Sequence, residues 1–200
     1  MAAVDKTNIA NLALSHLREK GFIENVETSN QAEAKNANLW YDPSRRQVLV
    51  DFDLGFARKR QTLTAHGDDP PAEWAFRYQY PASSIQPRHI EDPLGRGRPP
   101  IPFDLEQSDD GTQSILTNEE DAILVFTRDV TNTLFFTPHF VLGFSYLLAH
   151  YMAGALTGKK SIQDDTLAKY NLMINTAGAN EANATSKGTE GWTDTNPWKR

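Results

Sequence analysis

Histidines are the first residues to inspect for chemistry, because their pKa lies near neutrality and their ring nitrogens bind metals. The chain has five, which are His16, His66, His89, His139 and His150. They do not form the His-Glu-x-x-His pattern of zinc hydrolases, and none has a partner at a strong ligand spacing. There are no cysteines, which excludes thiolate metal sites and disulfide frameworks. We therefore predict no metal site and no cofactor.

The sequence lacks the common motifs of nucleophilic and nucleotide chemistry. The sequence contains no Gly-x-Ser-x-Gly elbow, no phosphate-binding glycine loop and no dinucleotide fingerprint. Gly95-Arg96-Gly97-Arg98 is rich in glycine, but prolines surround it and no helical pattern follows it. We therefore predict no catalytic residues and a protein that is not an enzyme.

Two groups of adjacent carboxylates occur, Asp109-Asp110 and Glu119-Glu120-Asp121. A glycan hydrolase needs two carboxyl groups across a cleft, with pKa values held apart. Neighbouring residues in a turn do not imply that geometry, so solvated turns are the simpler interpretation.

Two basic clusters occur, at Arg58-Lys59-Arg60 and at Arg96 with Arg98. They either serve solubility or contact phosphate or the acidic rim of another protein. The second cluster lies between Pro93 and Pro102, where four prolines and two glycines predict an exposed loop. The net charge of −6 argues against general nucleic-acid binding.

The C-terminal segment combines a polar composition with large aromatic residues. From residue 179 onward alanine, asparagine, glutamate, threonine, serine and glycine dominate, which predicts an extended tail over 179–200. Trp192 and Trp198 are two of the four tryptophans of the chain, and Arg200 ends it. These residues either anchor the tail in a pocket of a partner or fold back onto the protein's own core.

The strongest helical pattern runs from Pro138 to Leu156. Its apolar residues recur at steps of three, four and one, which is typical of a helix with one wide buried face. Thr137 suits the N-cap, Pro138 the first turn and Gly158 the position after the end. We expect the other apolar segments to pack on this helix, and its polar residues argue against a membrane span.

Four more helices are expected, at about 5–20, 28–40, 42–56 and 161–178. Thr28 and Gln31 have the spacing of a capping box, and Ser161 with Asp164 resembles one. Asp42-Pro43 reads as a fresh helix start, with proline at the first helical position. The N-terminus lacks the apolar core of a signal peptide.

Extended segments are expected between residues 58 and 136. Alternating aromatic residues predict a strand over 74–80, 85–90 is a short extended piece or a turn of helix, and 113–116 with 121–128 reads as a hairpin. The predicted fold is α+β and helix-dominant, a bundle of about five helices with an inserted antiparallel β region. The predicted divisions are 1–57 with 137–178 for the bundle, 58–136 for the β region and 179–200 for the tail.

The order of these features resembles a known family. A strand from Trp74 to Ala82 precedes Arg88-His89-Ile90. The segments 115–118 and 122–130 then precede the helix of 138–156. This order, over most of residues 5–178, is similar to that of the tail tubular protein A family, the head-to-tail adaptors of short-tailed bacteriophages.

The resemblance implies a structural virion protein, made in the host cytoplasm and placed at the head–tail junction. It implies a dodecameric ring that binds the portal protein and the tail nozzle protein, with DNA passing through its channel without sequence-specific binding and with no membrane. Trp192, Trp198 and Arg200 would then anchor the portal, and Arg96 and Arg98 would face the nozzle. A tail-associated glycan hydrolase and a small soluble binding module are the alternatives.

Overall fold

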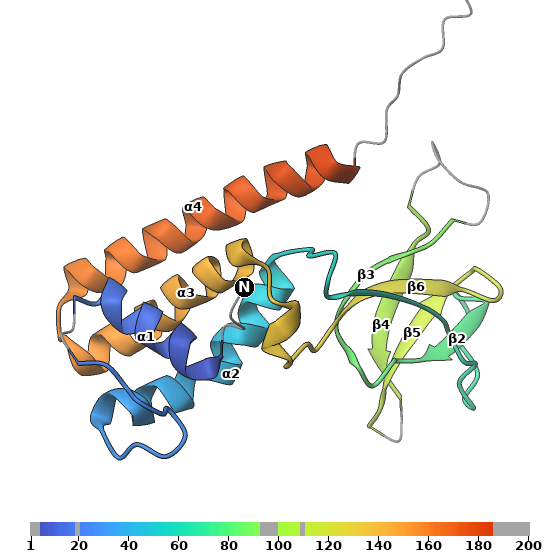
Figure 1. Cartoon of the computed structure of the whole chain (residues 1–200). Coiled ribbons are helices and arrows are strands. Elements are labelled where there is room, and N and C mark those ends of the chain that lie inside the picture. Colours follow the sequence, from blue (N-terminus) through green and yellow to red (C-terminus); the bar gives the residue numbers. More distant parts are fainter. Residues whose placement is uncertain (1–4, 19–20, 93–99, 109–110, 186–200) are drawn as a thin grey trace, which may run out of the picture.

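A computed structural model describes residues 5–18, 21–92, 100–108 and 111–185. Its helices gather at one end of the molecule and its strands at the other (Figure 1). The α-helices are α1 (Lys6–His16), α2 (Ala32–Asp51), α3 (Pro138–Leu156) and α4 (Lys160–Thr185). The strands are β1 (Arg58–Thr62), β2 (Phe76–Gln79), β3 (Ser84–Ile90), β4 (Phe103–Gln107), β5 (Gln113–Thr117) and β6 (Ile123–Arg128), and a short 3-10 helix, η1 (Thr133–Phe135), precedes α3.

The fold is α+β, but the predicted bundle of about five helices is wrong, because the described residues form four α-helices. The two helices expected at 28–40 and 42–56 are one continuous helix, α2, with Pro43 inside it. Its buried residues recur at helical spacing on both sides of Pro43, at Ala34, Ala37, Tyr41, Ser44, Arg45, Val48 and Leu49. One buried face therefore holds the helix together across a proline that local preference would place at a helix start. The capping box was also wrong, since Gln31 is the N-cap and its side chain makes no capping bond.

Helix α3 is the centre of the helical body, as its pattern predicted. It begins at Pro138, and the hydroxyl of Thr137 accepts a hydrogen bond from the Phe140 N–H. The other three helices all pack against it, and Phe140 and Phe144 are completely buried. Gly158, just past its end, has a φ of +62°, which is the left-handed conformation that glycine adopts without strain.

Helix α3 is long enough and apolar enough to cross a membrane, contrary to the expectation drawn from its polar residues. The same composition is that of a core helix, and ten of its residues are buried within the described fold.

Helix α4 is longer than predicted. It begins at Lys160, one residue before the predicted start, and it continues through Thr185. Residues 179–185, which were expected to begin the extended tail, are therefore helical. The expectation rested on the loss of apolar periodicity, but alanine favours a helix without any buried face, and Ala177, Ala179, Ala182 and Ala184 supply it.

The six strands form two antiparallel sheets of three, with the orders β1-β6-β3 and β2-β5-β4. The predicted hairpin is wrong, because β5 and β6 belong to different sheets. Pairing is between distant segments, such as Tyr78 with Ile115 and Lys59 with Phe126. Glu119 to Asp121 do form a turn, but this turn carries the chain from one sheet to the other.

Single bridges join the sheets at two corners, Ala65 with Tyr78 and Ile90 with Ile101. The strands therefore follow one another in a closed order, β1-β6-β3-β4-β5-β2, around a small separate core. That core consists of Leu63, Tyr78, Ile90, Ile115, Ala122, Leu124 and Phe126. Strands β1 and β4 were not predicted, although Phe103 and Leu105 alternate with acidic residues in β4.

Candidate interaction surfaces

The predicted site residues fall outside the part of the chain that the structure describes. This holds for the proposed portal anchors Trp192, Trp198 and Arg200 and for the proposed nozzle contacts Arg96 and Arg98. The carboxylates Asp109 and Asp110 lie outside it as well. The candidate surfaces built below come from the described residues alone.

Arg88 on β3 joins the β region to the helical body. Its guanidinium donates hydrogen bonds to the carbonyl oxygens of Leu49, Val50 and Phe52, at 2.9–3.0 Å, and to the Thr127 hydroxyl at 2.8 Å. Helix ends leave carbonyls without partners inside the helix, so an arginine suits the C-terminal end of α2. Burial lowers the pKa of Arg88, and the nearby Asp53 works to raise it. This contact fixes how β3 meets α2.

A second contact of the same kind links α2 to the residues that follow β6. Arg45 of α2 is 2% exposed, and it donates to Asp129 and to the Val130 carbonyl, the latter at 2.8 Å. Burial works to raise the pKa of Asp129, but the hydrogen bond and charge of Arg45, helped by Arg46, hold that pKa below its ordinary value. A buried arginine needs such partners, because an unpaired buried charge is costly. Sequence patterns did not reveal these pairs, whose members lie far apart in the chain.

A polar cluster at one end of the β region superficially resembles a Ser-His-Asp triad. His66 Nε2 lies 3.4 Å from Ser108 Oγ, and His66 Nδ1 lies 3.6 Å from a carboxylate oxygen of Asp68. Arg77 donates to Ser108 Oγ at 3.1 Å and to Glu106 at 2.7 Å. The close spacing of His66 and Asp68 is the sequence signal that could have indicated this cluster.

The hydrogen bonds of His66 do not suit nucleophilic catalysis. The backbone N–H of Asp68 donates to His66 Nδ1 at 3.1 Å, so the ring proton is on Nε2, which faces Ser108. A general base would need a bare nitrogen there to accept the serine proton. Ser108 Oγ instead receives bonds from two donors, His66 and Arg77, which keeps its oxygen an acceptor. The arrangement connects β2 to β4, and an adjoining pocket of about 250 Å³ is lined by His66, Gln79, Tyr80, Thr112 and Gln113.

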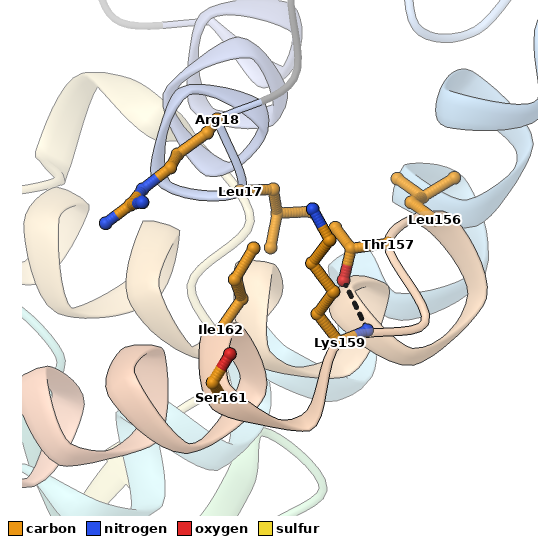
Figure 2. A pocket seen from close by; sticks show the side chains of 7 residues that line it. All are labelled: Leu17, Arg18, Leu156, Thr157, Lys159, Ser161 and Ile162. Carbon is orange, nitrogen blue, oxygen red and sulfur yellow. Dashed lines mark hydrogen bonds between the residues drawn. The ribbon is translucent and has the colours of Figure 1, made fainter.

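A pocket of about 270 Å³ lies where the end of α1 meets the connection between α3 and α4. Figure 2 shows its lining residues, which are Leu17, Arg18, Leu156, Thr157, Lys159, Ser161 and Ile162. The Thr157 hydroxyl accepts a bond from the Lys159 N–H at 3.1 Å, and Arg18 points away from the other residues (Figure 2). The charged groups of Arg18 and Lys159 therefore do not converge on one point of this pocket (Figure 2).

Two of the helical histidines, His16 and His150, contact neighbouring elements of the helical body. His16 stacks on Tyr146 with ring centroids 4.0 Å apart, and its Nε2 lies 3.0 Å from the Ser145 hydroxyl. Burial and the charge of Lys169 lower the pKa of His16. His150 Nδ1 bonds to the Gln163 carbonyl at 3.0 Å. No group of three or more potential ligand residues suited to a metal ion occurs among the described residues.

Large apolar side chains are exposed on several faces. Phe22 is 74% exposed before α2, Leu39 65% exposed on α2, and Leu172 65% exposed on α4. Leu134 and Phe135 of η1 are exposed where the β region meets α3. Leu39 and Leu172 lie on two different helices, α2 and α4, which both pack against α3.

The basic cluster Arg58-Lys59-Arg60 supplies the first three residues of β1. Arg58 bonds to Asp53 at 2.8 Å, and Arg60 bonds to Glu91 at 3.2 Å. Lys59 lies over the Phe126 ring at 5.9 Å and is exposed.

No protein-family model matches the chain, and no curated protein is similar enough to match it.

Proposed function

We propose that this chain is a structural virion protein, a head-to-tail adaptor that forms a ring between the portal and the tail nozzle. The ring would be dodecameric, and DNA would pass through its channel. Support comes from the order of sequence features, which resembles that of the tail tubular protein A family. The helical body, with strands inserted between α2 and α3, is compatible with that assignment.

The observation that carries the proposal is the exposure of large apolar side chains on different elements of the helical body. A ring of identical copies uses head-to-tail contacts, in which one surface of a copy meets a different surface of the next. Such a protein needs two unlike contact surfaces. Leu39 on α2 and Leu172 on α4 provide exposed apolar anchors on two different helices that pack against α3.

The test mixes the purified chain with the portal protein encoded in the same genome and weighs the products by native mass spectrometry. We expect a ring of this chain bound to the portal. Leu39→Ser should weaken that ring, whereas Asn36→Ser, a partly exposed polar position on the same helix, should leave it unchanged. Absence of any complex with the wild-type chain would overturn the proposal.

The proposed portal anchors are tested in the same mixture. A chain cut after Thr185 keeps all of α4, and full-length Trp192→Ala with Trp198→Ala removes only the aromatic rings. We expect both to bind the portal more weakly than the wild-type chain. Unchanged binding by both would move the portal contact to the described body.

A further inference from the structure

Strand β1 has an open edge, which means that no strand among the described residues pairs along its outer side. Its hydrogen-bond ladder with β6 continues beyond both ends of the strand. The Arg128 N–H donates to the Ala57 carbonyl at 2.8 Å, and the Leu63 N–H donates to the Ala122 carbonyl at 2.9 Å. Hydrogen-bonded positions alternate along an antiparallel strand, so the odd-numbered residues of β1 face β6. The backbone groups of Arg60 and Thr62 therefore point away from the sheet.

Strand β4 has an open edge of the same kind. The Ser108 N–H bonds to the Thr112 carbonyl at 2.8 Å, so the even-numbered residues of β4 face β5. The backbone groups of Phe103, Leu105 and Gln107 point outward. The Leu105 N–H is bonded to the neighbouring carboxylate of Asp104 at 2.8 Å, which is a local substitute for a strand partner.

These two edges lie on opposite sides of the β region. In the closed order β1-β6-β3-β4-β5-β2, two strands separate β1 from β4 in either direction. The open edge of β1 lies at the corner bridged by Ala65 and Tyr78, and the open edge of β4 lies at the corner bridged by Ile90 and Ile101. The corners are on opposite sides, so the two edges cannot pair within one copy but can pair between copies.

The two edges carry opposite charge. On β1, Lys59 and Arg60 are exposed, and on β4, Asp104 and Glu106 are exposed. Like charges opposite one another destabilise a strand pair, and opposite charges stabilise it. Pairing β1 with β1, or β4 with β4, is therefore disfavoured. A β1-to-β4 contact is head-to-tail, which is the kind that closes rings.

We infer that the open edge of β4 in one copy pairs with the open edge of β1 in the next copy, joining the β regions into a belt of sheets. This inference rests on the proposed ring. It assigns the β regions a contact of their own, in addition to the apolar contacts of the helical body. Exposed edges of this kind are templates for strand addition by another chain.

Two charge-reversed chains test the inference. The first carries Lys59→Glu and Arg60→Glu, so that β1 and β4 are both acidic. The second carries Asp104→Lys and Gln107→Lys, which makes β4 basic like β1. Both leave the Arg77–Glu106 pair intact, and the lost Arg60–Glu91 pair is exposed and contributes little to stability.

We expect each reversed chain alone to give at least tenfold less ring on the portal than the wild-type chain, measured by native mass spectrometry. An equal mixture of the two should restore the ring with the copies alternating, because every β4-to-β1 contact is again complementary. Circular dichroism and thermal unfolding confirm that each variant is folded. Lys35→Glu with Lys160→Glu is the control for the first chain, since both double changes lower the net charge by four and its two positions lie on α2 and α4, away from both edges.

A second pair of variants tests the backbone contact itself. Thr62→Pro and Leu105→Pro each remove an outward N–H and place a ring on the open edge without removing a ladder bond. Both should block ring formation while the monomer remains folded. If the proline variants and the charge-reversed chains each form the ring in normal yield, the edge contact is wrong and the adaptor proposal stands. Failure of the wild-type chain to form any ring would overturn both.

Discussion

The guanidinium of Arg88 on β3 donates a hydrogen bond of 3.0 Å to the carbonyl oxygen of Leu49, near the end of α2. The same side chain also binds the carbonyls of Val50 and Phe52. Together with Arg45 and Asp129, it forms a polar junction between the helical body and the β region. In an adaptor, this junction would set the position of the β region relative to the rest of the ring.

Replacing Arg88 should destabilise the protein far more than replacing an exposed arginine. Arg88→Met removes the donors from three helix-end carbonyls, and we expect a loss of about 3 kcal/mol in the free energy of unfolding. Arg60→Met, at a side chain that is 63% exposed, should cost less than about 1 kcal/mol. Urea unfolding measures both, and equal losses would show that the junction does not depend on Arg88.

The Arg45–Asp129 pair should make stability depend on acid. The pKa of Asp129 is lower in the folded state than its ordinary value of 3.8, so its contribution is complete above that value. The contribution is lost as the pH falls through the folded pKa. Asp129→Asn should cost about 2–3 kcal/mol at pH 7. The difference from the wild type should shrink below about pH 4, and a difference independent of pH would contradict this account.

His16 should produce a separate dependence at higher pH. Its folded pKa is lower than the ordinary value of 6.5, so the unfolded chain binds the proton more readily. Wild-type stability should therefore decrease as the pH falls through and below 6.5. His16→Gln should flatten the profile between pH 7.5 and pH 5, as followed by thermal unfolding. His139→Gln, at an exposed position, should leave the wild-type profile unchanged.

The continuity of α2 across Pro43 predicts an unusual stabilising substitution. Proline inside a helix removes a backbone hydrogen bond and crowds the preceding turn. Pro43→Ala should therefore raise the free energy of unfolding by about 1–2 kcal/mol, less than the full proline penalty because the unfolded chain becomes more flexible. If a helix instead began at Pro43, the change would be neutral or destabilising.

Local patterns predicted only part of this fold. The helix of 138–156 was predicted to the residue, because its buried face, cap and terminal glycine all agree. Pro43 was misread because its local preference and the buried face of α2 conflict, and packing prevailed. The separation of β5 from β6 depends on contacts such as Tyr78 with Ile115, which lie too far apart in the chain for local patterns.

The candidate surfaces were still harder to predict. The alternation of Phe103 and Leu105 with acidic residues could have indicated the missed strand β4, but not that its edge is open. That property depends on which strands become neighbours. The junction of Arg88 with α2 likewise joins residues from distant segments and leaves no periodic trace in the sequence.

The most direct test of the account is electron cryomicroscopy of the full-length chain mixed with the portal protein encoded in the same genome. The account predicts a closed ring of copies on the portal, with neighbouring β regions touching through β1 and β4. A portal that carries no density for this chain, while the chain remains monomeric in the same mixture, would contradict its assignment as an adaptor.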